Sequence, residues 1–286
     1  MKNPKSKILN PKQIQNFYPL ALTRPVEELR CGARTLKDHP KRKINYLWDL
    51  IRHLKEDLEE DLRILGAGVR GQVHPSVVIY APENVLIEEG AEVEASAVLD
   101  ARSGPIHIGK NSIIRPHTCL RGPLSIGSGC RVGGEVIHSI FHGNSNKAHY
   151  GFIGHSYIGE WVNLGAGTTN SNLKNNYGSV KVMVNGKEID SDEQFLGCFI
   201  GDHAKTGIGT LITTGAVIGV AANVFGGGVT PKFVPSYSWG IDQEYKLERA
   251  LEVAVRVMKR RGKKLTAEGK ALLQKVFQQT QAERKS

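Results

Sequence analysis

The sequence predicts an all-β solenoid, a parallel β-helix with α-helices at both ends. Aliphatic residues recur every six positions between Val73 and Val224, and glycine commonly follows them. The chain is rich in glycine (32 of 286 residues) and poor in aromatic residues (7%). Neither the period of about 3.6 residues of a helix nor the alternation of a simple strand gives six. A hexad with one inward aliphatic residue and a small corner residue is typical of a β-helix.

Three hexads close one coil, and stacked coils lie about 4.8 Å apart, the ordinary strand spacing. Each coil buries its aliphatic side chains against those of its neighbours, so stability is roughly a sum of nearest-neighbour contributions. The residues in register are Val73, Ile79 and Val85; Ile87, Val93 and Leu99; Ile108, Ile114, Leu120, Ile126 and Val132; Phe152, Ile158 and Leu164; and Ile200, Thr206, Ile212, Ile218 and Val224.

Helices are expected on both sides of the repeats. Residues 45–65 place leucine and isoleucine at three- and four-residue steps, which predicts an amphipathic helix that caps the open first coil. Residues 243–261 predict a second helix ended by Gly262, and a third begins after Thr266 as its N-cap. The expected domains are an N-terminal arm (1–44), a helical cap (45–72), the β-helix (73–241) with an inserted hairpin segment (171–195), and basic C-terminal helices (242–286).

The net charge of +10 belongs to the two ends of the chain. Residues 1–12 hold four lysines and no acid, and residues 242–286 hold twelve basic and six acidic residues. Between them, 22 basic residues balance 22 acidic ones. Because the excess sits on terminal segments, we expect a solvated surface and do not expect nucleic acid as the main partner.

The four cysteines, at 31, 119, 130 and 198, lie far apart and form no CxxC pair. We also expect no secretory leader, and no apolar run approaches the ~18 residues that a membrane span needs. We therefore expect free thiols, a cytoplasmic location and no membrane span. We also expect no bound metal or cofactor.

Two segments, 133–151 and 171–195, interrupt the hexads on either side of the in-phase coil 152–170. The second contains a hairpin at 179–190 with Asn185-Gly186 at its tip, and such insertions tend to lie on the binding face of a solenoid. Both interruptions are rich in histidine and asparagine. These residues either satisfy backbone groups at turns or form a functional site.

The position of His149 favours a functional site. If Phe152 and Ile158 point inward, His149 lies three residues off the inward phase, near a corner on the outside. An imidazole at the solvent edge can accept a proton from an amine nucleophile. Backbone amides of the glycine-rich coil could hold the oxyanion that forms when the amine attacks a thioester. The pattern therefore predicts acyl transfer to an amine.

The run from Asn146 to Asn172 resembles the acetyltransferase domain of the bifunctional N-acetylglucosamine-1-phosphate uridylyltransferase / glucosamine-1-phosphate N-acetyltransferase family. The matching motifs are Lys147-Ala148-His149, Phe152-Ile153-Gly154, and Val162-Asn163-Leu164-Gly165-Ala166-Gly167-Thr168. Residues 73–286 look closest to a variant bacterial branch, which also carries the segment matched by residues 197–206.

This resemblance implies a left-handed β-helix that works as a homotrimer, with sites between neighbouring copies. Acetyl-coenzyme A would be the acyl donor. The acceptor would be an amino-sugar phosphate or nucleotide-sugar in cell-envelope precursor synthesis, as in UDP-N-acetylglucosamine biosynthesis.

The resemblance also implies roles for individual residues. His149 falls on the catalytic base, and Asn163 and Asn172 fall on contacts to the sugar. Ala166, Gly167 and Gly226 fall along the coenzyme A site.

Several family residues are replaced here. Two tyrosines near the sugar align with Phe152 and Leu173, which leaves Tyr150 and Tyr177 to substitute for them. The lysine that binds the sugar phosphate aligns with Ile137. Its role would pass to Arg115, Arg121 or Lys174, and Lys147 is also expected to contact substrate.

Residues 17–36 look like the opening of the variant branch's N-terminal domain, yet residues 1–44 are too few for a nucleotide-binding fold. We interpret this arm as a vestige of a nucleotidyltransferase domain. A separate nucleotidyltransferase would then supply that activity.

Two other interpretations remain open. A γ-class carbonic anhydrase is also a trimeric β-helix, but its zinc site requires a histidine pair five residues apart. The histidines at 138, 142, 149 and 155 give spacings of four, six and seven. The other alternative is a trimeric scaffold or sugar-nucleotide-binding protein without catalysis.

Overall fold

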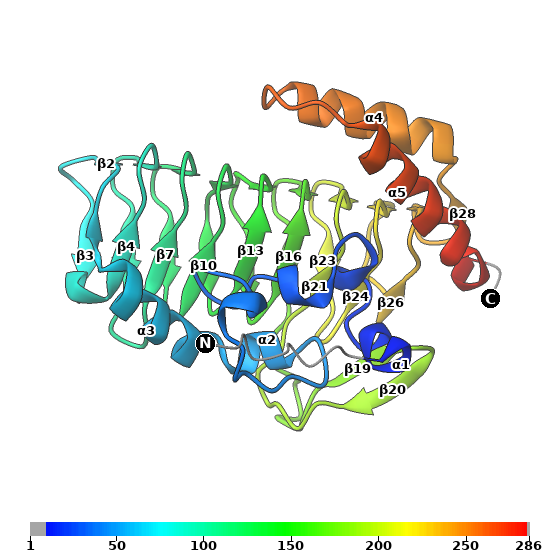
Figure 1. Ribbon diagram of the computed structural model, residues 1–286, viewed down its shortest axis with the longest axis horizontal. Helices are drawn as coiled ribbons and strands as arrows, with labels where there is room; N and C mark the ends of the chain where they lie inside the picture. The colour runs from blue at the N-terminus through cyan, green and yellow to red at the C-terminus, as the bar shows by residue number, and fades with distance from the viewer. Residues whose placement is uncertain (1–9, 285–286) are drawn as a thin grey trace, which may run out of the picture.

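The protein, described by a computed structural model over residues 10–284, is a parallel β-solenoid flanked by helices (Figure 1). Each of the first five coils contributes one strand to each of three sheets, and coils are numbered here from the N-terminal end. The lysines at 2, 5 and 7 lie outside the described residues. The parallel solenoid is confirmed, and its left-handedness stays a prediction.

The first sheet contains β1 (Gly68–Val69), β4 (Val85–Ile87), β7 (Ile106–Ile108), β10 (Leu124–Ile126), β13 (Ile140–Gly143), β16 (Tyr157–Glu160), β21 (Phe199–Ile200), β24 (Val217–Ile218) and β26 (Phe233–Val234). The second contains β2 (Gln72–Val73), β5 (Glu92–Val93), β8 (Ile113–Ile114), β11 (Arg131–Val132), β14 (Asn146–Lys147), β17 (Asn163–Leu164), β22 (Lys205–Thr206), β25 (Asn223–Val224), β27 (Ser238–Trp239) and the antiparallel β28 (Gln243–Glu244). The third contains β3 (Val78–Tyr80), β6 (Val98–Asp100), β9 (Cys119–Arg121), β12 (Glu135–Ile137) and β15 (Phe152–Gly154), followed along the same side by the pair β18 (Thr169–Asn170) and β23 (Leu211–Ile212).

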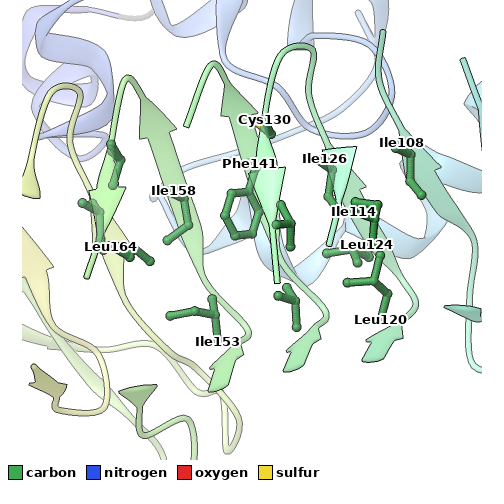
Figure 2. Close-up of a cluster of buried hydrophobic side chains, with 14 of the residues drawn as sticks. Ile108, Ile114, Leu120, Leu124, Ile126, Cys130, Phe141, Ile153, Ile158 and Leu164 are labelled. Carbon is green, nitrogen blue, oxygen red and sulfur yellow. The ribbon is translucent and has the colours of Figure 1, made fainter. Parts of the chain in front are cut away.

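The residues that recur every six positions form the core of the solenoid. Ile108, Ile114, Leu120, Ile126 and Val132 are all fully buried. Ile126 of coil 4 stacks on Ile108 of coil 3 (Figure 2), and Val132 stacks on Ile114 in the same way. The later run through Ile200, Thr206, Ile212, Ile218 and Val224 is buried as well. These positions confirm the predicted register over most of the chain.

The predicted register is wrong at Phe152. Its neighbour Ile153 is the fully buried residue, while Phe152 is only partly buried on the outer face. The pairing of β15 with β12 sets Ile153 opposite the inward-facing Val136. The step from Ile153 to Ile158 is five residues, so a strict six-residue count misplaces the strand by one residue.

The helix predicted over 45–65 forms as α2 (Asp49–Arg52) and α3 (Leu54–Leu65), but it does not cap the first coil. Its buried residues, among them Leu50, Leu54 and Leu58, join a cluster with outward-facing residues of the first sheet such as Ile140 and Phe199. The inward residues of coil 1 remain only partly buried. The apolar outer face of the first sheet therefore attracts the helix to the side of the solenoid, as Figure 1 shows.

The rest of the N-terminal arm covers the same sheet. Residues 10–44 form α1 (Pro11–Gln15) and three 3₁₀-helices, Leu20–Leu22, Val26–Glu28 and Leu36–Asp38, and contain no β-strand. The inserted hairpin, β19 (Lys181–Val184) and β20 (Lys187–Asp190), turns at Asn185-Gly186 as predicted. Its valines at 180, 182 and 184 pack into the arm's cluster, so the hairpin supports the arm.

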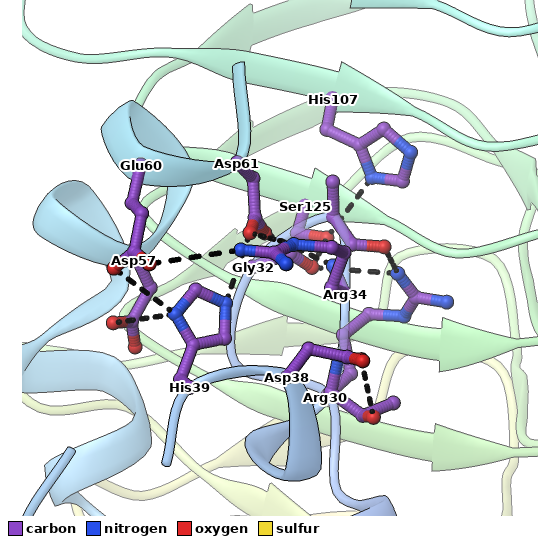
Figure 3. Close-up of polar contacts among 12 residues, drawn as sticks. Arg30, Gly32, Arg34, Asp38, His39, Asp57, Glu60, Asp61, His107 and Ser125 are labelled. Atoms are coloured by element: carbon purple, nitrogen blue, oxygen red, sulfur yellow. Dashed lines mark hydrogen bonds and ion pairs between the residues drawn. The ribbon is translucent and has the colours of Figure 1, made fainter. Parts of the chain in front are cut away.

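Ion pairs fix the arm to α3 (Figure 3). Arg34 Nε lies 2.5 Å from Asp61 Oδ1, His39 Nε2 lies 2.9 Å from the same oxygen, and Arg42 binds Asp57. Burial raises the pKa of Asp61, but the bonds from His39 and Arg34 outweigh burial and hold this pKa below its usual value. Removing both His39 and Arg34 would leave the buried Asp61 carboxylate without a cation, which is costly.

The C-terminal helices are α4 (Leu247–Lys259) and α5 (Ala267–Gln279), followed by a 3₁₀-helix, Gln281–Arg284. Thr266 caps α5 by accepting a hydrogen bond from Gly269 N (3.1 Å), as predicted. The first half of α4 packs with α5 and with residues of coils 8 and 9, such as Val220 and Tyr237. Its second half extends back along the solenoid (Figure 1).

Between residues 10 and 284, no helix is long and apolar enough to cross a bilayer.

The stacked core yields a stability prediction. Phe141 is fully buried in the column, so Phe141→Ala should lower the free energy of unfolding by about 3–5 kcal/mol, measured by urea denaturation. Ile208 is 85% exposed, and Ile208→Ala should change it by less than about 0.5 kcal/mol. Equal effects of the two changes would contradict the assigned register.

Candidate functional site

The turns that join the second sheet to the third form one edge of the solenoid, called here the 2–3 edge. His149 and Tyr150 lie on it in coil 5, between β14 and β15, and both are exposed. Ala166 and Gly167 occupy the same turn in coil 6, and Gly226 occupies it in coil 8. The outward position predicted for His149 is therefore the observed one, although Phe152 does not point inward.

Hydrogen bonds align these turns from coil to coil. Gly167 N donates to Tyr150 O (3.0 Å), and Gly209 N donates to Ala166 O (2.7 Å). A methyl group at Gly167 would meet Tyr150 Oη at 3.2 Å, so the tyrosine ring lies over this glycine. His149 and the three residues assigned to coenzyme A thus share one edge, with His149 at one end and Gly226 at the other.

Lys147 does not contact the outside. It takes an inward position of the second sheet, between Val132 and Leu164, and is 2% exposed. Its Nζ donates to Gly133 O (2.8 Å) and to His149 O (2.6 Å). Burial lowers the pKa of this ammonium to about 8. The predicted substrate contact is therefore corrected, because the inward phase of β14 places the side chain in the core, where it holds the turn that carries His149.

A cleft of about 420 Å³ lies at the far end of the 2–3 edge. Gly226 lines it together with Phe225, Trp239 and Ile241. Phe225 and Trp239 meet edge to face, with ring centroids 5.0 Å apart. Ile208, in the coil 7 turn of the same edge, is 85% exposed, and Val229, three residues after Gly226, is 63% exposed. This end of the edge therefore offers an apolar surface beside a glycine-rich turn.

Asn163 faces outward from the second sheet in coil 6, and His149 lies in the preceding coil 5. Asn146, its partner in the adjacent strand, donates from Nδ2 to Asn163 Oδ1 (3.3 Å). Asn163 is thus separated from His149 by one strand spacing along the solenoid and lies on the face next to the 2–3 edge.

The structure does not bring Asn172, Lys174 and Tyr177 to the 2–3 edge of the same chain. Asn172 follows β18, where the third sheet turns toward the first, and its Nδ2 contacts His155 Nδ1 (2.9 Å). Lys174 Nζ donates to Ser179 O (3.0 Å) within its own loop, and Tyr177 is 68% exposed there.

The histidines at this second corner are poorly suited to proton transfer. His138 and His155 stack with ring centroids 4.5 Å apart, and His138 Nε2 contacts Ile51 O at 3.0 Å. Burial lowers the pKa of His155 to about 3. A general base that works near neutrality must exchange its proton there, which this half-buried pair does not favour.

Two of the three cations proposed for the sugar phosphate are held in salt bridges. Arg115 lies on the 2–3 edge in coil 3, and its Nη1 is 2.9 Å from Glu94. Arg121 projects from the third sheet and is 3.7 Å from Glu135. Lys174 is the third, at the other corner.

Among the described residues, no group of three or more His, Cys, Asp or Glu side chains has an arrangement suited to a metal ion.

Sequence reasoning missed the outward residues of the second sheet other than Asn163. Arg131, Asn146 and Lys205 each precede an inward-facing residue, and this regular offset was a usable signal. Arg261, which follows α4 and binds Asn146 Oδ1, gave no signal, because nothing in the repeat predicts where a C-terminal helix returns.

Comparison with known proteins finds several relatives, although no family model matches the chain. A bifunctional sugar-1-phosphate nucleotidylyltransferase/acetyltransferase of Sulfurisphaera tokodaii is 38% identical over 167 residues, covering 57% of this chain and 40% of the relative. The bifunctional protein GlmU of Methanocaldococcus jannaschii is 30% identical over 236 residues, covering 76% of this chain and 56% of the relative. This chain spans about half the length of these curated relatives.

A crystal structure of AntD, an N-acyltransferase from Bacillus cereus, in complex with dTDP and coenzyme A, has 15% identity and a TM-score of 0.29. It covers 71% of this chain and 97% of that protein. A likeness this weak carries no argument about activity.

The buried Lys147 gives stability a distinctive pH dependence. Its pKa is about 8 in the folded chain and about 10.5 in an exposed lysine, so between these values the unfolded chain binds more protons. The free energy of unfolding of the wild type, relative to Lys147→Met, should therefore rise between pH 8 and 10.5 and stay flat below pH 8.

Denaturant titrations of both proteins at matched pH would measure this difference. The contributions of all other titrating groups to the free energy of unfolding cancel between the wild type and Lys147→Met. A difference that does not change with pH would mean that the Lys147 ammonium is hydrated rather than buried.

Proposed function

Because the chain is a hexapeptide-repeat β-solenoid that resembles the acetyltransferase part of the bifunctional relatives, we propose that it is an acyl-coenzyme A-dependent sugar N-acyltransferase. The observation that carries this proposal is the alignment along the 2–3 edge. An exposed His149 lies above the small residues Ala166 and Gly167, and the edge continues to the cleft at Gly226. Such an edge could hold both a general base for the amine nucleophile and an extended acyl-coenzyme A molecule.

In the proposed reaction, His149 takes a proton from the sugar amine as its nitrogen attacks the thioester carbonyl. The new C–N bond forms while the carbonyl oxygen gains negative charge, and backbone amides of the glycine-rich turns are suited to bind it. Collapse of this intermediate breaks the C–S bond. The thiolate of coenzyme A then takes the proton from His149, so protons and electrons balance.

The positioning of His149 depends on Lys147. A buried ammonium that donates to both Gly133 O and His149 O ties the turns of coils 4 and 5 together. Charge-assisted bonds of this kind are stronger than neutral ones, so they restrict the turn. A restricted base is better placed for attack than a mobile one.

We also propose that the acceptor is an amino-sugar phosphate and that the active assembly is a homotrimer. Asn172 and Tyr177 lie away from His149 within one chain, so a neighbouring copy would have to supply them. The N-terminal arm packs on the first sheet and leaves the 2–3 edge open to such a neighbour.

Replacing the proposed base tests the mechanism. His149→Ala should lower the rate of acyl transfer from acetyl-coenzyme A to glucosamine 1-phosphate by about 10²–10⁴-fold, the usual range for a general base. Its affinity for acetyl-coenzyme A should barely change, because Ala166 and the backbone of the edge remain. Thiol release and calorimetry would measure the two quantities.

The matched control is His74→Ala. His74 is also exposed on the 2–3 edge, but it lies in coil 1, four strand spacings or about 19 Å from coil 5. It should retain full activity. Full activity of His149→Ala would refute the mechanism, and a wild-type protein that does not bind acetyl-coenzyme A would favour a non-catalytic scaffold.

A further inference from the structure

The outer face of the second sheet carries a stripe of polar side chains beside the 2–3 edge. In register on four successive strands are Arg131, Asn146, Asn163 and Lys205. Adjacent strands lie about 4.8 Å apart, so the stripe spans about 14 Å. Asn146 lies in coil 5, three residues before His149, and three residues of extended chain reach at most about 11 Å.

A fifth residue reaches this stripe from the C-terminal end of the chain. Arg261 follows α4 and donates from Nη2 to Asn146 Oδ1, while Asn146 donates in turn to Asn163. In α4, only Ala250, Leu251 and Ala254 are buried, all in its first eight residues. The second half of the helix therefore carries Arg261 back along the solenoid to the coil of His149.

The cations of this stripe lack carboxylate partners among residues 10–284. Arg131 Nη1 donates to Asn111 O and Cys130 O (3.0 Å each), and Lys205 Nζ donates to His203 O (2.7 Å). Burial lowers the pKa of Arg261, and the nearby charge of Arg131 lowers it further. The nearest acid along the stripe is Glu92, two strand spacings or about 10 Å from Arg131.

Glu92 and Glu94 act on Arg131 from a distance, but neither forms a salt bridge with it. Like charges brought together without such a bridge repel each other, and an anion between them would relieve that repulsion. Guanidinium groups are matched to phosphate, because their planar N–H groups can bind two oxygens at once. Carboxamides such as those of Asn146 and Asn163 can both donate and accept, which suits sugar hydroxyls. By contrast, Arg115 and Arg121 already face Glu94 and Glu135.

We infer that Arg131 and Arg261 bind the phosphate group of the acceptor sugar, with Asn146 and Asn163 beside it. This inference rests on the proposed acyl transfer. Coenzyme A also carries phosphates, but its proposed path runs from coil 6 toward Gly226 in coil 8. Arg131 lies in coil 4, on the opposite side of His149. The phosphate assigned to this stripe is therefore that of the acceptor sugar.

Steady-state kinetics on Arg131→Gln and Arg261→Gln would test the assignment, with glucosamine 1-phosphate and glucosamine as acceptors. Each change should raise the KM for glucosamine 1-phosphate by about 10-fold or more and leave kcat and the KM for acetyl-coenzyme A nearly unchanged. The rate with unphosphorylated glucosamine should not respond. The matched control is Arg256→Gln, because Arg256 is 72% exposed on α4 and pairs with Glu252.

Three results would overturn the inference. A higher KM for acetyl-coenzyme A alone would assign the stripe to the coenzyme's phosphates. No change in either KM, with a lower melting temperature for Arg261→Gln, would mean that Arg261 only docks α4. Equal losses with glucosamine and its phosphate would exclude phosphate recognition. Arg131 belongs to the solenoid itself, so its variant tests the site even if α4 detaches.

Calorimetry separates this inference from the proposed function. If the wild type transfers no acyl group, the proposed function fails, yet binding of glucosamine 1-phosphate can still be measured. Loss of that binding in the Arg131→Gln/Arg261→Gln double variant, but not in Arg256→Gln, would support the phosphate site. A wild type that neither transfers an acyl group nor binds glucosamine 1-phosphate would contradict both.

Discussion

Strand spacing along the solenoid, about 4.8 Å per coil, is the constraint on which the rest of this structure depends. It is maintained by the inward column of aliphatic residues, in which Ile108, Ile126 and Ile158 stack with no or almost no exposure. Because each coil repeats the path of the last, residues at equivalent positions must line up on the outside as well. The same repeat that stabilises the core therefore aligns His149 with Ala166 and Gly226 on one edge, and Arg131 with Asn163 on one face.

Some departures from that repeat place polar side chains in the core. In coil 5, the inward position of the second sheet is Lys147 rather than an aliphatic residue, and coil 6 places Asn170 in the corresponding position of the third. Asn170 binds Gly154 N (2.8 Å) and Gly154 O (3.1 Å), as Lys147 binds the carbonyls of Gly133 and His149. These polar side chains take core positions that an aliphatic residue would otherwise fill, so the core buries less apolar surface. The loss of stability is explained if the backbone segments that they bind must hold a precise shape.

Most of the fold follows from local pattern, and most of the site's surroundings do not. The six-residue period identifies the solenoid because one inward residue per strand leaves a direct mark on the sequence. The hairpin tip at Asn185 and the cap at Thr266 are likewise local. The position of α3 was missed because a helix with an apolar face can cover either the open coil or the first sheet, and only the packing of residues such as Ile140 and Phe199 decides between them. Arg261 was missed for the same reason, since its partner Asn146 is far away in sequence.

The central claim is that this edge joins an acyl group to a sugar amine. The most direct measurement incubates the wild-type protein with acetyl-coenzyme A carrying a ¹³C-labelled acetyl group and with glucosamine 1-phosphate, and follows products by mass spectrometry. The account predicts a labelled N-acetylated sugar phosphate that accumulates in equal amount with free coenzyme A. Free coenzyme A accompanied only by labelled acetate, or no turnover of either substrate, would contradict it.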